Sequence, residues 1–179
     1  MQLKDAITSR KSVKHFSNKV PDWRKILRAI DYARFAPTAG KNFVNKFIII
    51  SDEDKIKILA EASQQEFVKD AKYIVIVTSD ATTLTRSYDE RGEYYTPQQS
   101  GAAIQNFLLG LTEQKLSTIW VGHFYEEQIK REFKIPDKMK VEAIFPIGME
   151  RKINTKPKLK PDLDSMIYFE KWGKSKMEN

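Results

Sequence analysis

The sequence predicts an α+β fold in which a small sheet is flanked by helices. Four short apolar runs, rich in β-branched residues, have the length and composition of buried strands. They alternate with longer segments in which apolar residues recur at helical spacing. The expected strands are residues 47–50, 73–77, 117–121 and 141–149, and the expected helices are residues 3–9, 21–36, 53–63, 98–114 and 125–133. A chain of 179 residues predicts one domain, residues 1–179.

Individual residues place the ends of these elements. Pro21 suits the opening turn of the second helix, and Pro37 ends that helix. Asp52 is a favourable N-cap for the third helix. Pro146 has no N–H to donate to a neighbouring strand, so it predicts an edge or a bulge in the last strand. The segment 98–114 is apolar around nearly its whole circumference, which predicts a central and buried helix.

Two segments fall outside this alternation. Residues 79–97 are polar and contain three tyrosines, and we expect them to form an excursion or a lid with weak local structure. Near the C-terminus, Ile167 to Phe169 and Trp172 are too apolar for a free tail. We expect this segment to dock on a neighbouring subunit, so that a dimer buries what a monomer cannot.

Composition narrows the possible functions. The formal net charge of +7 is compatible with a nucleic acid, an anionic cofactor or an anionic substrate. The absence of cysteine excludes disulfides, thiolate nucleophiles and cysteine-based metal sites. Only His15 and His123 could be imidazole ligands, and neither has a second ligand at metal-like spacing, so we expect no metal. With no apolar run of about 18 residues and no signal-peptide pattern, we expect a cytoplasmic protein without a membrane partner.

A basic cluster near the N-terminus is the first candidate site. Arg10, Lys11 and Lys14 supply three cations, and Ser12 supplies a hydroxyl, within five residues. Such a set can hold a phosphate through charge and directional donors. Taken alone, the run favours a solvated basic turn, because isolated charge runs usually lie on the surface, and the functional interpretation depends on other segments that suit the same ligand.

Two further segments are candidates for ligand binding. The small residues of 36–42 would let a flat ligand lie against the backbone, and the strand end at 119–122 can point N–H groups at a ligand. An ordinary turn and an ordinary strand end are the alternatives. The chain contains no GxGxxG, P-loop or nucleophile-elbow motif. We therefore expect no catalytic side chain, and instead an organic cofactor with a phosphate and a flat ring.

Five stretches resemble, in order and spacing, the motifs of the FMN-dependent nitroreductase family. They are Arg10-Lys11-Ser12-x-Lys14, Ala36 to Gly40, Gly101 to Asn106, Trp120-Val121-Gly122 and Pro146-Ile147-Gly148. The ending Phe169 to Gly173 is also similar to the family's C-terminal signature, and the resemblance spans nearly the whole chain. It implies a homodimer with a small central mixed sheet in each subunit, FMN at each of two subunit interfaces, and a C-terminal extension that docks on the partner.

The resemblance also implies an activity. Members pass electrons by a ping-pong mechanism from NADH or NADPH, through flavin N5, to a small oxidised acceptor such as a nitroaromatic, a quinone or a flavin. Carried over to this chain, Arg10, Lys11 and Ser12 would hold the phosphate and the ribityl chain. Lys156 or Lys158 would complete the phosphate site.

Other residues would surround the flavin ring. The resemblance places Lys14 near the N1–C2 carbonyl edge, where negative charge gathers on the reduced flavin. Gln64 would hydrogen-bond the pyrimidine edge, and Val121 and Gly122 would present backbone N–H groups near N5 and O4. The second subunit would contribute Pro37, Thr38 and Ala39.

The sequence departs from the family pattern around the ring. Where the family usually continues its second motif with Asn and then Gln-Pro-Trp, this chain has Lys41 and then Phe43 to Asn45. Asn42 would replace the family's asparagine through a one-residue shift, so Lys41 and Asn42 join the cofactor-binding candidates. Gln99 stands where the family often carries an acidic residue. We hypothesise that Lys41 makes the pocket favour anionic acceptors.

Two alternatives remain at this point. The altered ring segment could leave a flavin-binding protein with little turnover. The charge, together with Tyr88, Tyr94 and Tyr95, could instead suit a nucleic-acid-binding module. Against the second alternative, the cations are divided between the two ends of the chain, whereas a binding module presents its basic and aromatic groups together.

Overall fold

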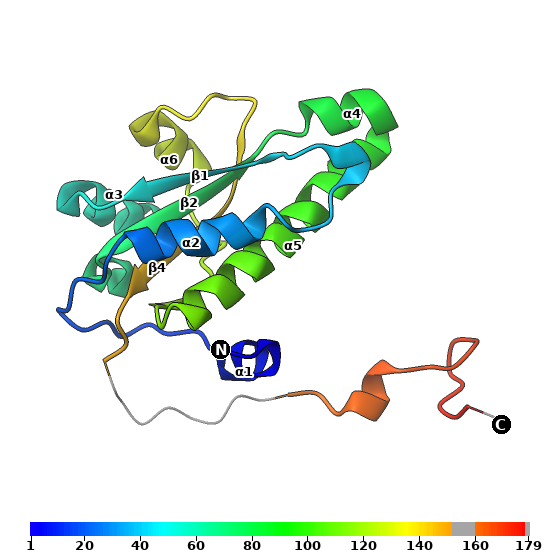
Figure 1. Ribbon diagram of the computed structural model, residues 1–179. Coiled ribbons are helices and arrows are strands. Elements are labelled where there is room, and N and C mark those ends of the chain that lie inside the picture. The colour runs from blue at the N-terminus through cyan, green and yellow to red at the C-terminus, as the bar shows by residue number, and fades with distance from the viewer. Residues whose placement is uncertain (152–159, 178–179) are drawn as a thin grey trace.

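The computed structural model describes residues 1–151 and 160–177 (Figure 1). The helices are α1 (Leu3–Ser9), α2 (Arg24–Ala33), α3 (Glu53–Ser63), α4 (Thr82–Tyr88), α5 (Glu90–Glu113) and α6 (Glu126–Phe133). Short 3₁₀ turns are η1 (Ala39–Lys41), η2 (Glu66–Asp70) and η3 (Leu163–Met166). The strands are β1 (Asn45–Ile50), β2 (Tyr73–Ser79), β3 (Ser117–Thr118) and β4 (Lys140–Gly148). The α+β class and the order of the expected elements are confirmed.

The four strands form one sheet in the order β1-β2-β4-β3. Each pair of neighbouring strands is antiparallel. The parallel pairing of the expected mixed sheet is confined to an isolated bridge between Ser12 and Thr118. This bridge attaches the N-terminal segment to the β3 edge of the sheet.

Helices cover both faces of the sheet, so the fold has three layers (Figure 1). Side chains alternate along a strand, and Val75 and Phe145 point to one face, where they pack with α2 and α5. Ile76 and Ile144 point to the other face and pack with α3 and α6. All four side chains are fully buried. The long helix α5 lies in the core, as its apolar circumference predicts.

The expectation of weak structure in residues 79–97 is wrong, because α4 and the first turns of α5 occupy this segment. The Asp80 carboxylate accepts a hydrogen bond of 2.9 Å from the Thr82 N–H and so satisfies the first backbone N–H of α4. Gly92 lets α5 approach α4 closely, since a Cβ at this position would lie 2.3 Å from the backbone carbon of Leu84. Whether the segment acts as a lid stays a prediction.

The expectation that Pro146 marks an edge or a bulge is also wrong. Strand β4 lies between β2 and β3, and the register shift of the β2–β4 pair falls at Val77 and Thr78 instead. Proline is tolerated because β3 is short: its ladder with β4 covers only Ile147 and Gly148. Beyond that ladder, Pro146 has no partner strand on the β3 side that would require its missing N–H.

The C-terminal segment extends away from the sheet (Figure 1). The rings of Tyr168 and Trp172 contact each other, with centroids 4.7 Å apart, yet Trp172 remains 89% exposed. A single subunit therefore leaves this aromatic segment uncovered. Among the described residues, no helix is long and apolar enough to cross a membrane.

Candidate cofactor site

The N-terminal basic cluster is fixed to the edge of the sheet by backbone hydrogen bonds. The Val13 N–H donates to the Thr118 carbonyl at 2.9 Å, and the Ser17 N–H donates to the Met149 carbonyl at 2.8 Å. Between these points the ring of Phe16 packs on Gly148, where a Cβ would lie 2.9 Å from the ring. The glycine of the Pro146-Ile147-Gly148 motif thus has a structural role: it makes room for the segment that carries the cations.

The cluster itself combines three cations with a hydroxyl. Arg10 is half-buried, and Lys11, Ser12 and Lys14 are exposed. The Lys11 Nζ lies 2.7 Å from a carboxylate oxygen of Glu150. This donor set suits an anion with several oxygen acceptors, as a phosphate monoester has.

Lys14 links the basic cluster to η2, the turn that follows α3. Its Nζ lies 5.2 Å from the centroid of the Phe67 ring, a distance typical of a cation–π contact. Phe67 follows Gln64, whose left-handed backbone (φ 53°) ends α3. The Gln64 amide donates a long hydrogen bond of 3.4 Å to the Tyr125 hydroxyl. The N-terminal cations, the end of α3 and the loop after β3 therefore form one cluster.

The strand end after β3 supplies the remaining part of this cluster. The Val121 N–H donates to the Ile144 carbonyl at 3.1 Å, so it is not free to contact a ligand. The expectation that Val121 presents this group near the flavin is wrong, because the residue pairs with β4 instead. Gly122 is exposed, and its N–H has no hydrogen-bond partner within residues 1–151 and 160–177. Gly122 follows Thr118 by four residues, so it lies at most about 14 Å from the Ser12 bridge.

One buried polar atom in this cluster lacks a partner. The Thr118 hydroxyl is buried, and it has no hydrogen-bond partner among the residues that the structure describes. Thr118 is also the residue that pairs with Ser12. Among the described residues the cluster offers cations, a free N–H at Gly122 and a buried hydroxyl without a partner, and this set fits a phosphate-bearing planar cofactor.

The second predicted segment lies elsewhere in the subunit. The turn η1 is attached to the N-terminal half of α5, whereas the basic cluster lies beyond the C-terminal end of that helix (Figure 1). The helix rise places Gln99, which contacts η1, about 21 Å from Glu113 at the end of α5. One subunit therefore does not bring Pro37, Thr38 and Ala39 to the basic cluster. The sequence assigned these residues to a second subunit, and that assignment stays a prediction.

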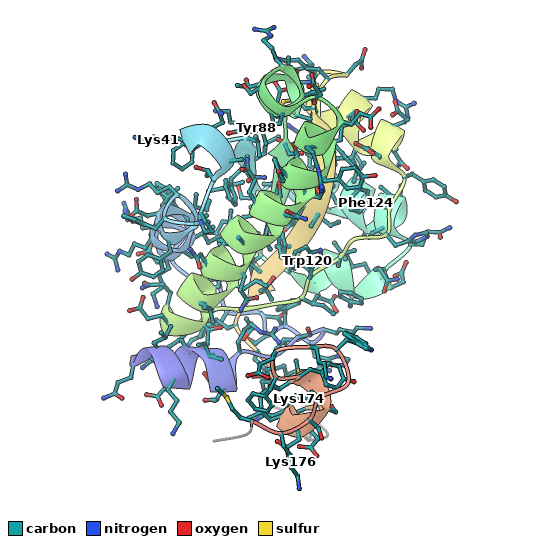
Figure 2. All side chains as sticks on the ribbon, turned by 90° about the vertical axis from the view of Figure 1, so that its right-hand side faces the viewer. Lys41, Tyr88, Trp120, Phe124, Lys174 and Lys176 are labelled. Atoms are coloured by element: carbon teal, nitrogen blue, oxygen red, sulfur yellow. The ribbon has the colours of Figure 1, made fainter. Side chains whose placement is uncertain are left out.

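The turn η1 has an unusual backbone. Gly40 and Lys41 both have left-handed dihedral angles, with φ of 58° and 60°. The Tyr88 hydroxyl of α4 lies 2.7 Å from the position of a Cβ on Gly40, and Figure 2 shows Lys41 and Tyr88 at the same end of the molecule. The Asn42 amide donates to the Ala39 carbonyl at 3.2 Å, so Asn42 uses this donor within its own turn. Sequence reasoning gave no sign of this constraint.

Sequence reasoning also gave no role to Gln99, Phe67 and Tyr125, each of which contacts a candidate site residue. The partners of Gln99 lie 60 and 57 residues away in the sequence, so no local spacing could indicate them. The candidates Lys156 and Lys158 lie outside the described residues. In the described part of the chain, no group of three His, Cys, Asp or Glu residues could hold a metal.

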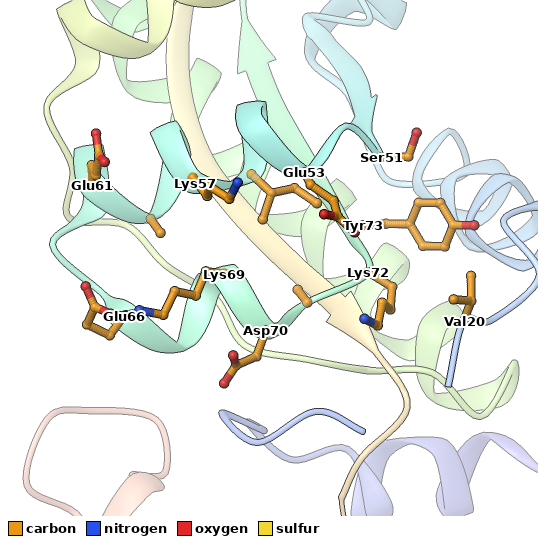
Figure 3. A pocket seen from close by; sticks show the side chains of 13 residues that line it. Val20, Ser51, Glu53, Lys57, Glu61, Glu66, Lys69, Asp70, Lys72 and Tyr73 are labelled. Carbon is orange, nitrogen blue, oxygen red and sulfur yellow. Dashed lines mark hydrogen bonds and ion pairs between the residues drawn. The ribbon is translucent and has the colours of Figure 1, made fainter. Parts of the chain in front are cut away.

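A separate pocket of about 700 Å³ lies between α3 and η2 (Figure 3). Charged side chains surround it, but two of its lysines already have acidic partners: Lys57 pairs with Asp54 at 2.8 Å, and Lys69 pairs with Glu66. None of the predicted cofactor residues lines this pocket. It is therefore distinct from the candidate cofactor site.

Comparison with known proteins decides the family. The model of the "Nitroreductase family" matches residues 59–149, which is half of the chain. The protein belongs to the nitroreductase family. The region matched includes the C-terminal part of α3 and all of β2, α5, β3 and β4. The expectations of this family and of an oxidoreductase enzyme are confirmed.

Relatives of the nitroreductase family match over nearly the full length. A protein of Methanothermobacter thermautotrophicus named "Putative NADH dehydrogenase/NAD(P)H nitroreductase" is 25% identical over 178 residues, 96% of this chain and 88% of its own length. A nitroreductase family protein from Clostridium difficile 630 is 26% identical, with a TM-score of 0.83 over 96% of this chain and 99% of that one. An FMN-dependent nitroreductase from Clostridium difficile R20291 is 18% identical, with a TM-score of 0.79 over 95% and 100% of the two chains.

Proposed function

We propose that the protein is an FMN-dependent oxidoreductase that uses NADH or NADPH to reduce a small oxidised acceptor, such as a nitroaromatic compound, a quinone or a flavin. What supports the proposal is that the segment carrying Arg10, Ser12 and Lys14 pairs through Ser12 with Thr118, four residues before Gly122, in a chain of the nitroreductase family. Bound FMN would supply the redox chemistry, taking two electrons from the nicotinamide and giving them to the acceptor in a second half-reaction.

The residues of the chain would bind and orient this cofactor. Arg10, Lys11 and Ser12 would hold the phosphate, with Lys156 or Lys158 as a further cation. Lys14, held over Phe67, would place its positive charge beside the ring edge where reduction gathers negative charge. At the other end of the cluster, the free N–H of Gly122 would contact the ring.

The proposal includes a homodimer in which the site is completed by the second copy. Within one subunit, η1 contacts the N-terminal half of α5 and the basic cluster lies beyond its C-terminal end, which supports a contribution of Thr38 and Ala39 from a partner. Surfaces suitable for a partner are present, since Leu163, Met166 and Trp172 are 66%, 65% and 89% exposed. Burying large apolar side chains of this kind is a general driving force for association. A cytoplasmic location also stays a prediction.

The absorbance spectrum of the purified protein tests the proposal. We expect flavin bands, or their appearance with quenched fluorescence when FMN is added to flavin-free protein. Replacing the phosphate ligands, as in Arg10→Ala with Ser12→Ala, should weaken FMN binding at least tenfold. Lys19→Ala is the control, because Lys19 is an exposed cation of the same segment without an ion pair among the described residues. A colourless protein that does not bind added FMN would overturn the proposal.

Anaerobic mixing with NADH or NADPH then tests turnover. We expect the yellow colour to bleach promptly with at least one nicotinamide and to return when an acceptor is added. Bound FMN that resists bleaching by both donors would contradict an enzyme and favour a flavin-binding protein with little turnover. Salt-dependent retention on DNA without flavin would favour the nucleic-acid alternative.

A further inference from the structure

Gln99 connects the core of the molecule to the η1 turn. Its Oε1 accepts a hydrogen bond of 3.0 Å from the Ala39 N–H, and its Nε2 donates one of 3.2 Å to the Asn42 carbonyl. The side chain projects from α5 and is only 7% exposed. One buried amide therefore bonds both the first residue of η1 and the residue that follows it.

This contact requires a side chain that both accepts and donates a hydrogen bond. The turn offers one donor and one acceptor, and a glutamine side chain supplies one acceptor and up to two donors. An ionised carboxylate could accept from Ala39 but would oppose the Asn42 carbonyl. An apolar side chain would leave the Ala39 N–H and the Asn42 carbonyl, which are partly buried, without these hydrogen bonds.

The turn also needs an external restraint. Lys41 has a φ of 60°, a left-handed conformation that is unfavourable for a residue with a side chain. The hydrogen bonds within the turn, from the N–H and the amide of Asn42 to the Ala39 carbonyl, lie on one side of it. Gln99 supplies the contacts from the helix, so its two hydrogen bonds set where the turn lies relative to α5.

We propose that Gln99 is a positioning residue for the flavin ring. It would fix the turn through which Thr38 and Ala39 reach the cofactor bound by the partner subunit. This inference rests on the proposed function. Because the basic cluster lies at the far end of α5, Gln99 acts on the ring side of the site and leaves the phosphate ligands of its own subunit unchanged.

The variant Gln99→Glu separates this role from a purely structural one. A protonated carboxyl offers the same acceptor and one O–H donor, so it can make both contacts, whereas the ionised form loses the donor. Burial raises the pKa of such a carboxyl, so its neutral form persists to a higher pH than that of an exposed glutamate. We expect FMN affinity close to that of the wild type at pH 5 and about tenfold weaker at pH 8. Wild-type affinity should lack this pH-dependent step.

Gln98→Glu is the matched control. Gln98 is exposed on the same helix, one residue earlier, so the variant adds the same charge without touching the turn. FMN affinity is measured by quenching of flavin fluorescence, and the visible circular dichroism of bound FMN reports the surroundings of the ring. We expect Gln98→Glu to match the wild type in both signals at every pH.

A second variant keeps the proposal testable if Gln99→Glu does not fold. Gln99→Met fills a similar volume but makes neither hydrogen bond, so FMN affinity should fall about tenfold without the pH-dependent step. Wild-type affinity and an unchanged flavin spectrum in Gln99→Met, or identical pH profiles for Gln99→Glu and Gln98→Glu, would overturn the positioning role while the proposed function stands. A wild-type protein that does not bind FMN would overturn both.

Discussion

Lys11 and Glu150, 139 residues apart in the sequence, form an ion pair across the edge of the sheet, with 2.7 Å between Nζ and Oε1. The lysine side chain is 46% exposed and the glutamate side chain 24% exposed, so the pair is partly accessible to solvent. Lys11 is one of the proposed phosphate ligands. The Glu150 carboxylate therefore lies where a bound phosphate would meet a like charge.

The first prediction follows from this like charge. Replacing Glu150 by Gln removes the repulsion and leaves Lys11 in place, so FMN affinity should rise about threefold at low salt, or about 0.6 kcal/mol. The gain should shrink as salt is added, because partly exposed charges are screened. Glu53→Gln makes the same charge change at the far end of α3 and should leave the affinity unchanged. If Glu150→Gln instead binds FMN more weakly, the carboxylate orients Lys11 for binding rather than repelling the phosphate.

The second prediction concerns Lys14. Its ammonium lies over the Phe67 ring, which holds the charge beside the proposed ring site. Lys14→Met removes the charge, so the reduced flavin should lose stabilisation relative to the oxidised form. We expect the two-electron midpoint potential of bound FMN to become about 30 mV more negative, which corresponds to about 1.4 kcal/mol. Dye equilibration measures the potential, with Lys19→Met as control, and an unchanged potential would exclude this role for Lys14.

The sheet could be predicted from the sequence because its signal is local. The run Tyr73 to Val77 is uncharged and rich in β-branched residues, and it forms the centre of β2. The prediction of weak structure for residues 79–97 is wrong because the helices in this segment depend on tertiary contacts. The hydrogen bond from the Thr82 N–H to Asp80 and the close approach at Gly92 stabilise a polar segment that has no strong apolar period of its own.

In the candidate site, too, the features with a local sequence signal could be predicted and those that depend on tertiary contacts could not. The cations at 10–14 could be recognised because charge and motif lie in one short segment. The engagement of the Val121 N–H could not be predicted, because it depends on a pairing with Ile144, 23 residues further along the chain. Gln99 is the same case: its importance comes from contacts with Ala39 and Asn42 that only the folded chain makes.

The third prediction is a pH dependence of stability. Hydrogen bonds from Thr82, followed by the ammonium of Lys138 at 2.9 Å, lower the pKa of Asp80 from 3.8 to about 2. The carboxylate therefore stabilises the fold above pH 3.8, and this contribution is lost as the pH falls toward 2. Solvent screens the pair, so Asp80→Asn should lower the free energy of unfolding by about 1 kcal/mol at neutral pH.

Urea unfolding at several pH values measures this effect. The difference in the free energy of unfolding between wild type and Asp80→Asn should decrease by about half on going from pH 7 to pH 3. Asp137→Asn is the control, because Asp137 is an exposed aspartate whose carboxylate has no ion pair within the described ranges. A difference that stays constant down to pH 3 would contradict the lowered pKa.

The fourth prediction compares two glycines of α5. A Cβ on Gly110 would lie 2.8 Å from the Cα of Ala29 in α2, whereas a Cβ on Gly101 would meet nothing within 4 Å. Gly110→Ala should therefore lower the free energy of unfolding by about 2 kcal/mol through overpacking. Gly101→Ala should leave the stability of one subunit unchanged or raise it by up to about 1 kcal/mol. Equal effects in urea unfolding would contradict the close α2–α5 packing.

The last prediction concerns the choice of acceptor. Lys41 is exposed on the turn that Gln99 holds, and it makes no ion pair among the described residues. Its charge is therefore available to an acceptor that enters beside the flavin. Lys41→Ala should lower kcat/KM for 4-nitrobenzoate relative to neutral 4-nitrobenzamide by about threefold to tenfold, as expected for the loss of one partly exposed charge pair. Lys46→Ala removes a nearby exposed charge and should keep the wild-type ratio. An unchanged ratio in Lys41→Ala would show that this lysine does not select anionic acceptors.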